Sequence, residues 1–317
     1  MQESIFFSPL SSLRNKEQEI MIEKPRVPDI YIIGAQKSGT TTLYDWLSQH
    51  PQIYGHPLAK DYPFFSSSQT FKEGLSQFSS FLKKAPKNTL ALGGEANAMY
   101  SSSSIQRMQE VIPFAYLIAI LREPVIRAYS AYTYAIERLM ENRPFGQAIS
   151  EELQGLVYEP TDALQRDYLG HGHYAQQLRE VFQFFPRERV KIVFFENLKA
   201  DPITELKAIF EFLDIKNDFI PDLSIRNETK GSHRSKWLTK LTYAKPSSEK
   251  LRKLGKLLVP FSIRTSIRQK LAEFNRIEAP KPEFPDDVRS LLREYYKKEI
   301  TALESLLDKE INVWHTN

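Results

Sequence analysis

The sequence of 317 residues contains no cysteine and no apolar run long enough to cross a membrane. Without cysteine there can be no disulfide, no thiolate nucleophile and no cysteine-ligated metal. The longest apolar run, FAYLIAIL at 114–121, is far shorter than the roughly 20 residues of a membrane span. The N-terminus shows neither a long apolar core nor a small-residue cleavage site, so we expect no secretory signal and a cytoplasmic protein.

Positive charge is concentrated in one part of the chain. The net charge is +4, but residues 230–276 contain 13 Lys or Arg and two acidic residues, which leaves −7 for the rest. Such a segment should attract an anionic partner. Residues 250–271 interleave basic and apolar side chains, which fits a solvated helical lid, peripheral membrane contact or an acidic acceptor. No nucleic-acid-binding signature is present, so we predict no nucleic acid partner.

Segments with strand and helix patterns alternate along the chain. This order predicts an α/β fold with a central, mostly parallel sheet flanked by helices in three layers. Residues 1–24 are predicted to form a flexible N-terminal arm, and residues 25–317 a single domain. The predicted strands lie at 28–35, 90–96, 114–121 and 190–198, and the predicted helices at 41–50, 123–140, 173–185, 201–215 and 286–307.

Residues 34–42, GAQKSGTTT, form a glycine-bracketed loop between the first strand and the first helix. Backbone N–H groups and a helix N-terminus converge in such a loop and bind phosphate. A nucleoside triphosphate loop, G-x-x-x-x-G-K-[ST], carries its lysine after the second glycine. In this sequence Thr40 occupies that lysine position, and the lysine of the motif, Lys37, lies inside the loop. The pattern favours a 5′-phosphate whose next group is not a γ-phosphate, and a tight turn without a ligand is the alternative.

A second motif, LREPVIRAYSAY at 121–132, follows a predicted buried strand. Arg122 comes directly after the strand, at the carboxyl edge where α/β proteins bind ligands. Ser130 lies about two turns into the next helix. Arg122 is either a salt-bridge partner or, together with the loop at 34–42, a ligand of a second phosphate.

The two motifs resemble the 5′- and 3′-phosphate motifs of sulfotransferases that use 3′-phosphoadenosine 5′-phosphosulfate (PAPS). The closest resemblance is to bacterial members and to domains that act on heparan-type glycans, and it extends over roughly residues 28–312. It implies a P-loop-like fold and chemistry that requires no metal. It also implies a role for a short basic loop over the adenosine and 3′-phosphate, although a solvated basic turn is the alternative there. The implied ligands are Lys37, Ser38, Gly39, Thr40, Thr41 and Thr42 for the 5′-phosphosulfate, Arg122 and Ser130 for the 3′-phosphate, and Lys230, Gly231, Ser232, His233 and Arg234 in the basic loop.

The catalytic base is less clearly indicated by this resemblance. Glycan-type members carry a glutamate in an E-x-x-F-F stretch, and the matching stretch here begins with Asp61, which we predict to be the base. Glu95, in GGEANAMY, is the second candidate. Glycan-type members place a lysine after that glutamate, but here Ala96 follows it. His50 and His56 are the alternatives if the base is a histidine.

We therefore predict a PAPS-dependent sulfotransferase that sulfonates a hydroxyl or amine of a glycan, lipid or small natural product. The sequence indicates neither the acceptor nor the oligomeric state. The alternatives are a P-loop-type nucleotide kinase, which would require magnesium, and a non-catalytic binder of an acidic glycan or membrane. The aromatic residues that could contact an acceptor are Tyr54, Tyr62, Phe64, Phe65, Tyr100, Tyr132 and Tyr134.

Overall fold

A computed structural model of the chain describes residues 25–156, 158–224, 232–233, 276–277 and 282–315, with a few single positions between 267 and 274. The predicted N-terminal arm and nearly all of the basic segment 250–271 lie outside the described residues. Five strands form an all-parallel sheet in the order β2-β3-β1-β4-β5, which confirms the predicted α/β class. The strands are β1 (Ile30–Gly34), β2 (Ile53–Lys60), β3 (Leu90–Gly94), β4 (Tyr116–Leu121) and β5 (Val190–Phe194).

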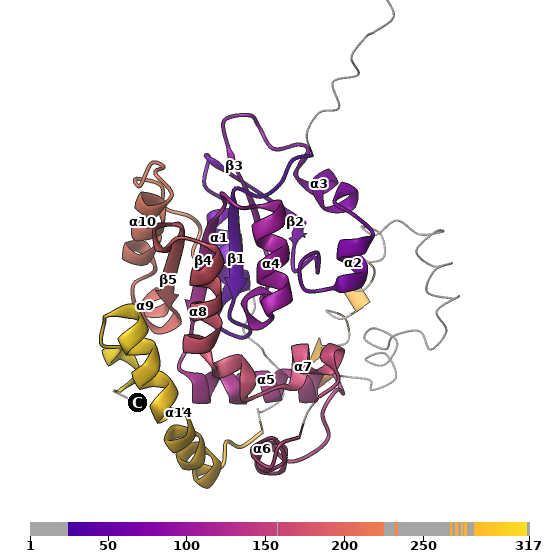
Figure 1. Ribbon diagram of the computed structural model, residues 1–317, viewed down its shortest axis with the longest axis vertical. Helices are drawn as coiled ribbons and strands as arrows, with labels where there is room; N and C mark the ends of the chain where they lie inside the picture. Colours follow the sequence, from indigo (N-terminus) through magenta and orange to yellow (C-terminus); the bar gives the residue numbers. More distant parts are fainter. Residues whose placement is uncertain are drawn as a thin grey trace, which may run out of the picture.

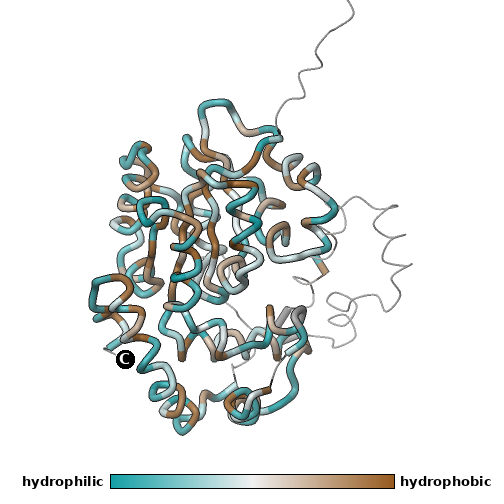
Figure 2. Tube along the Cα trace, viewed as in Figure 1, coloured by the Kyte–Doolittle hydropathy of each residue, from teal (hydrophilic) through white to brown (hydrophobic). Residues whose placement is uncertain are grey.

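Helices cover both faces of this sheet and complete three layers (Figure 1). Alternate residues of β1 enter different apolar clusters, with Tyr31 and Ile33 on one face and Ile30 and Ile32 on the other. This is the two-residue period of a strand that is buried on both faces. Figure 2 shows the hydrophobic residues along the central strands. The first face packs on α3 (Ser76–Leu82), α4 (Ser102–Val111) and α8 (Tyr174–Phe184), and the second on α1 (Thr40–Leu47), α9 (Phe195–Ala200) and α10 (Pro202–Phe212).

A third apolar cluster lies beside the carboxyl edge of the sheet. It joins α5 (Pro124–Glu137) and α6 (Phe145–Leu153) to the long helix α14 (Asp286–Leu307). In Figure 1, α5, α6 and α7 (Pro160–Arg166) lie below the sheet, and α14 runs along its lower side. The remaining short elements are α2 (Ser68–Lys72), η1 (Ala98–Tyr100), η2 (Gly170–Gly172), η3 (Arg187–Arg189), η4 (Asn312–Trp314), and the strands β6 (Ser232–His233) and β7 (Arg276–Ile277), which pair antiparallel.

Within the five-stranded sheet, β2 is the strand that the sequence pattern did not predict. It is an edge strand and pairs only with β3, with a register shift between Gly55 and Lys60. Pro57 lies within that shift. Proline cannot donate to a ladder and is tolerated at edges and bulges. The sequence of β2 therefore lacks the regular apolar pattern from which a strand can be predicted.

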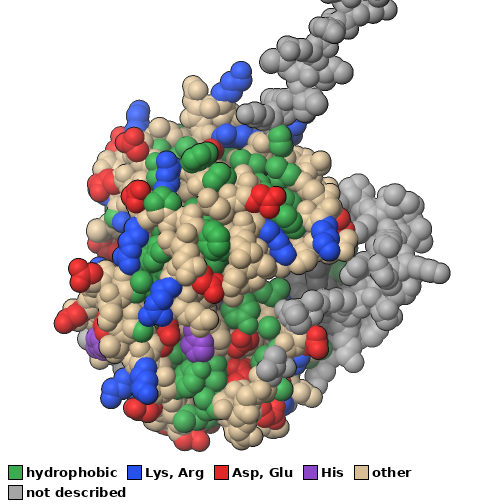
Figure 3. Space-filling model, in the orientation of Figure 1, with side chains coloured by type: hydrophobic (Ala, Val, Ile, Leu, Met, Phe, Trp, Pro, Cys, Tyr) green, Lys and Arg blue, Asp and Glu red, His purple; other side chains and the backbone are tan. Residues whose placement is uncertain are grey.

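The surface face drawn in Figure 3 carries acidic and basic side chains that are interspersed rather than segregated by sign. The positive excess of the sequence falls in 230–276, nearly all of which lies outside the described residues. Among the helices that are described, none has the length and apolar character needed to cross a bilayer.

Candidate functional site

The loop after β1 joins that strand to α1 through two residues in the left-handed region. Lys37 has φ 67° and Gly39, the residue that caps α1, has φ 91°. No side-chain hydrogen bond caps the start of α1, and no acidic residue lies in its first turn. The first N–H groups of a helix have no intrahelical acceptor. The start of α1 therefore provides N–H donors and a positive dipole end that suit an anion.

Four hydroxyl side chains of the loop and the first turn of α1 surround this helix start. Ser38 and Thr40 are buried, while Thr41 and Thr42 are partly buried. The Ser38 hydroxyl is fully buried and makes no hydrogen bond of ordinary geometry within the described residues. Burial raises the pKa of the nearby Tyr174 phenol to about 12, and Ser38 opposes part of that shift. A buried hydroxyl without a partner is costly unless a ligand supplies one. This orphaned group fits a site that binds a polar ligand.

Phe195, the first residue after β5, limits what the loop can contain. A Cβ atom added at Gly39 would lie 2.9 Å from the Phe195 ring, so no larger residue fits there without a shift. The same ring lies 4.7 Å from the Arg122 guanidinium carbon, a cation–π contact. Phe195 thus packs against both phosphate motifs.

Arg122 connects the second motif directly to the first. Its Nη1 donates a hydrogen bond of 3.1 Å to the Lys37 carbonyl oxygen. Burial lowers the pKa of the Arg122 guanidinium, and the nearby Glu196 carboxylate opposes that shift. Glu196 accepts hydrogen bonds from the Glu123 N–H (3.0 Å) and from Nε1 of Trp314 (2.9 Å). Residues near the C-terminal end therefore help to hold the acidic partner of Arg122.

Ser130, Tyr134 and Arg138 continue the site along α5 and its C-cap. They are spaced by four residues and lie on one side of the helix. Nζ of Lys37 lies 4.2 Å from the centre of the Tyr134 ring, and Cζ of Arg138 lies 3.6 Å from it. Tyr134 was considered from the sequence as an acceptor contact, whereas Arg138, four residues after it, was not considered.

The helix α7 borders the loop on another side. Nε2 of Gln36 and Nδ2 of Asn97 both donate to the Leu164 carbonyl, at 2.8 and 3.1 Å. The side-chain oxygen of each amide is buried without a hydrogen-bond partner in the described part of the chain. Three segments thus meet at the Leu164 carbonyl: α7, the loop after β1 and the loop after β3. The side-chain oxygens of Gln36 and Asn97 are the two hydrogen-bond acceptors at this point.

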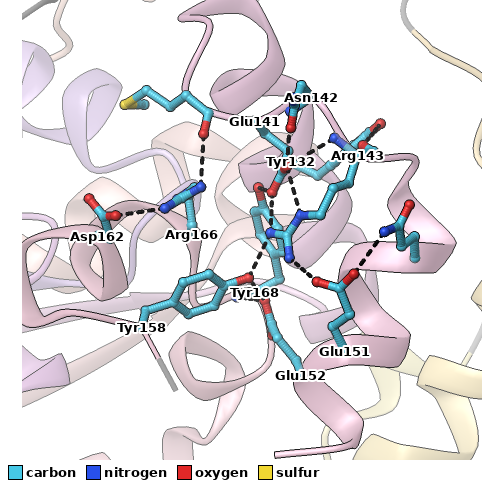
Figure 4. A network of polar contacts seen from close by, with 12 residues as sticks. Tyr132, Glu141, Asn142, Arg143, Glu151, Glu152, Tyr158, Asp162, Arg166 and Tyr168 are labelled. Carbon is cyan, nitrogen blue, oxygen red and sulfur yellow. Dashed lines mark hydrogen bonds and ion pairs between the residues drawn. The ribbon is translucent and has the colours of Figure 1, made fainter. Parts of the chain in front are cut away.

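A polar network holds α7 and its neighbours in place (Figure 4). Arg143 pairs with the buried Glu141 (2.6 Å) and with Glu151, and Arg166 pairs with Asp162 (2.6 Å). Burial alone would raise the pKa of Glu141, but the hydrogen bonds from Arg143 outweigh it and lower that pKa to about 2, so the carboxylate is held as an anion. The network fixes the segment between α5 and α8 that borders the site.

Glu152 is a second carboxylate in the same network, and it is partly buried. It accepts hydrogen bonds from the backbone N–H groups of Tyr168 (3.1 Å) and Leu169 (2.8 Å) and from the Tyr158 hydroxyl (2.9 Å). Burial raises the pKa of Glu152 to about 7, and nearby Asp167 adds to the shift. Its partners are two backbone N–H groups and one tyrosine hydroxyl of the same segment, so its role in the described structure is to hold that segment.

The two candidate carboxylates differ sharply in environment. Asp61 follows β2 with φ 54°, its side chain is 52% exposed, and it pairs with Lys60 and accepts a 3.3 Å bond from the Ala96 N–H. Glu95 follows β3 and is 3% exposed. Its oxygens accept bonds from the Tyr31 hydroxyl (2.9 Å) and from the N–H groups of Phe65 (2.8 Å) and Ser66 (3.1 Å). Burial raises the pKa of Glu95, and these three donors oppose the shift.

Both histidines considered from the sequence have structural contacts. His50 is buried against Phe210 and hydrogen-bonds the Lys216 carbonyl through Nε2 at 2.9 Å. The His50 side chain therefore contacts the chain after α10. His56 stacks on Phe81, and burial lowers the pKa of its imidazole.

Several of the aromatic residues considered as acceptor contacts belong to the core instead. Those that are buried in the apolar clusters are Tyr62, Phe64, Phe65 and Tyr132, whereas Tyr54, Tyr100 and Tyr134 are only partly buried. Within the predicted basic loop, Ser232 and His233 form β6, and Lys230, Gly231 and Arg234 lie outside the described residues.

Comparison with known proteins identifies the family of this chain. A family profile described as "Sulfotransferase domain" matches residues 27–304. The chain belongs to the sulfotransferase domain family. It is 26% identical over 294 residues to the human bifunctional heparan sulfate N-deacetylase/N-sulfotransferase 3, a match that covers 90% of this chain and 30% of that protein.

A second relative and one solved structure extend the comparison. The mouse heparan sulfate glucosamine 3-O-sulfotransferase 3B1 is 26% identical over 207 residues, which are 65% of this chain and 51% of that protein. The chain thus spans about half or less of the length of these two relatives. The crystal structure of a sulfotransferase from Alicyclobacillus acidocaldarius matches with a TM-score of 0.65 at 23% identity, over 92% of this chain and 99% of that one. That match shows a shared sulfotransferase fold.

Proposed function

We propose that this protein transfers a sulfonate group from PAPS to a hydroxyl or amine of an acceptor. The observation that carries the proposal is the hydrogen bond from Arg122 to the Lys37 carbonyl, which joins the two phosphate motifs within one site. The uncapped start of α1 supports binding of the 5′-phosphosulfate by Lys37 and by the N–H and hydroxyl groups of residues 38–42. Arg122 and Ser130 would hold the 3′-phosphate.

The reaction in this proposal is an in-line displacement at sulfur. The acceptor oxygen or nitrogen forms a bond to sulfur while the bond from sulfur to the bridging oxygen breaks. That oxygen leaves with the electron pair on 3′-phosphoadenosine 5′-phosphate (PAP), and the positive charge of Lys37 stabilises it. The acceptor proton passes to a carboxylate base and then to solvent.

Asp61 is the carboxylate that we propose as this base. It lies at the carboxyl edge of the sheet, as do the loop after β1 and Arg122, and its side chain is 52% exposed and accessible to an acceptor. Glu95 is enclosed by Tyr31, Phe65 and Ser66, so accepting a proton there would disrupt contacts that hold the chain after β2. We therefore assign Glu95 a positioning role.

The two relatives named as heparan sulfate sulfotransferases support a glycan as one class of acceptor, alongside lipids and small natural products. The cytoplasmic location, contact of 250–271 with a membrane and the role of 230–234 over the nucleotide stay predictions. Thr40 occupies the position of the lysine that a nucleotide kinase would need, which supports sulfonate transfer over phosphoryl transfer.

Calorimetric titration with PAP, and separately with ATP and magnesium, tests this proposal. We expect PAP to bind more tightly than ATP, and Arg122→Ala to weaken PAP binding by at least about tenfold, because a charge-assisted contact is lost. Arg189 provides a matched control, since it stacks on Tyr116 at 4.8 Å and donates to the Phe114 carbonyl at 2.6 Å at the opposite edge of the sheet. Preference for ATP would indicate a kinase, and no binding of either nucleotide would indicate a non-catalytic binder.

A further inference from the structure

The peptide group between Arg122 and Glu123 is held at both of its polar atoms. Its carbonyl oxygen, which belongs to Arg122, accepts a hydrogen bond of 2.9 Å from the Tyr174 hydroxyl. Its N–H, which belongs to Glu123, donates a hydrogen bond of 3.0 Å to Oε1 of Glu196. Because a peptide group is planar, holding both polar atoms fixes its orientation. The backbone from which the Arg122 side chain extends is therefore fixed as well.

The same peptide group leads directly into α5. The Glu123 carboxylate caps that helix, because it accepts hydrogen bonds from the N–H groups of Val125 (3.3 Å) and Ile126 (2.7 Å). Ser130 lies on α5, about two turns after this cap. The orientation of one peptide group thus affects both Arg122 and Ser130, the two residues that the proposed function places at the 3′-phosphate.

Trp314 contacts both side chains that hold this peptide group. Its Nε1 donates a hydrogen bond of 2.9 Å to Oε2 of Glu196, and its ring centre lies 6.0 Å from that of Tyr174. The indole is buried, and it also packs edge-on against Phe194 with the ring centres 5.4 Å apart. Each oxygen of the Glu196 carboxylate therefore has an N–H donor, one from the indole and one from the held peptide group.

We propose that Trp314 is a positioning residue for the 3′-phosphate of the nucleotide, and that it acts through Glu196 on Arg122. This inference rests on the proposed function and adds two positioning residues to it. Without the indole N–H, one Glu196 oxygen loses its donor, so the carboxylate can shift and the peptide group that it holds can turn. Binding of the 3′-phosphate would then have to order Arg122 again, and that cost weakens binding.

The test compares the dissociation constants of PAP and adenosine 5′-phosphate, which has no 3′-phosphate, by calorimetry. We expect Trp314→Phe to weaken PAP binding about fivefold, the cost of ordering one long side chain, while binding of adenosine 5′-phosphate changes less than about twofold. Phenylalanine keeps an aromatic ring in the core and removes the N–H. A purely structural defect would weaken both nucleotides alike and leave the ratio of the two constants unchanged.

Trp46→Phe is the matched control for the loss of a buried indole. Trp46 is 7% exposed, against 6% for Trp314, but it lies in the apolar cluster on the other face of the sheet. This variant should leave the ratio of the two dissociation constants as it is in the wild type.

A double-mutant cycle tests whether Trp314 acts through Glu196. Glu196→Ala should itself lower the preference for PAP, since the Glu123 N–H loses its acceptor. In that background Trp314→Phe should change the ratio of the two constants less than about twofold, because the carboxylate on which the indole acts is absent. Full additivity of the two substitutions, or an unchanged ratio in Trp314→Phe alone, would overturn this inference and leave the proposed function intact.

Two outcomes are kept apart from these. A wild type that binds PAP no more tightly than adenosine 5′-phosphate would overturn the 3′-phosphate site of the proposed function itself. Thermal unfolding identifies a variant that is not folded. If Trp314→Phe is such a variant, the ratio in Glu196→Ala decides in its place: a lowered preference for PAP supports the inference, and an unchanged one overturns it.

Discussion

The assignment of the catalytic base can be tested by comparing Asp61→Asn with Glu95→Gln. Asp61 is half exposed, and within the described structure its carboxylate pairs with Lys60 and accepts a hydrogen bond from the Ala96 N–H. Replacing its carboxylate by an amide removes the proton acceptor and little else. We expect turnover of an acceptor to fall at least about 100-fold, with PAP affinity unchanged and stability altered by less than about 1 kcal/mol.

Glu95→Gln should act mainly on stability. The Glu95 oxygen that accepts from Tyr31 and Phe65 can be replaced by an amide oxygen, but the amide NH₂ then faces the Ser66 N–H. One hydrogen bond to a buried carboxylate is lost and two donors confront each other, at a cost of about 2–3 kcal/mol. For a domain of this size that corresponds to a fall in melting temperature of about 3–5 °C.

Three measurements on each variant separate the two roles: thermal unfolding, PAP titration, and turnover with a saturating acceptor. The reasoning is refuted if Glu95→Gln keeps wild-type stability and PAP affinity while turnover collapses and Asp61→Asn remains active. Glu95 would then be the base, and its buried contacts would form only in the absence of substrate. Loss of stability in Glu95→Gln with an inactive but stable Asp61→Asn would support the proposed assignment.

Three further predictions concern the loop and the segment that borders it. Lys37→Ala should lower turnover at least about 100-fold, because the charge at the leaving oxygen is lost; a steady-state assay with substantial remaining activity would contradict that role. Gly39→Ala should weaken PAP binding and destabilise the protein by about 1–3 kcal/mol, since the new Cβ meets Phe195 and φ is 91°. Gly74→Ala is its control, with φ 89° and open space around the added atom, and a similar loss of PAP affinity there would refute the steric explanation. Burial lowers the pKa of His171 to about 3. As the pH falls below about 6.5, the unfolded state therefore binds a proton before the folded state does. We expect the free energy of unfolding to fall by about 2 kcal/mol between pH 6.5 and 5. Urea unfolding at these two pH values should show that slope in the wild type and a smaller one in His171→Gln; equal slopes would show that His171 is not buried as a neutral group.

Much of the fold could be predicted because its central elements are encoded locally. The apolar stretches that became β1, β4 and β5 are short and continuous, and the helices between them show helical spacing. Their alternation alone indicates a parallel sheet with helices on both faces. The edge strand β2 was missed because Pro57 and the register shift interrupt its pattern, and only its pairing with β3 shows it to be a strand.

Part of the candidate site could likewise be predicted from the sequence, and part of it required the tertiary structure. By itself the sequence determined the loop at 34–42, Arg122 and Ser130, because each motif consists of neighbouring residues whose spacing along the chain is their chemical signature. Only the tertiary structure decided that Glu95 is enclosed while Asp61 is exposed, since burial depends on chain segments that pack from elsewhere. It also decided that Lys37 and Arg138 share one tyrosine ring, because that contact joins residues about 100 positions apart. Local patterns specify which groups are available, and long-range packing determines which of them meet.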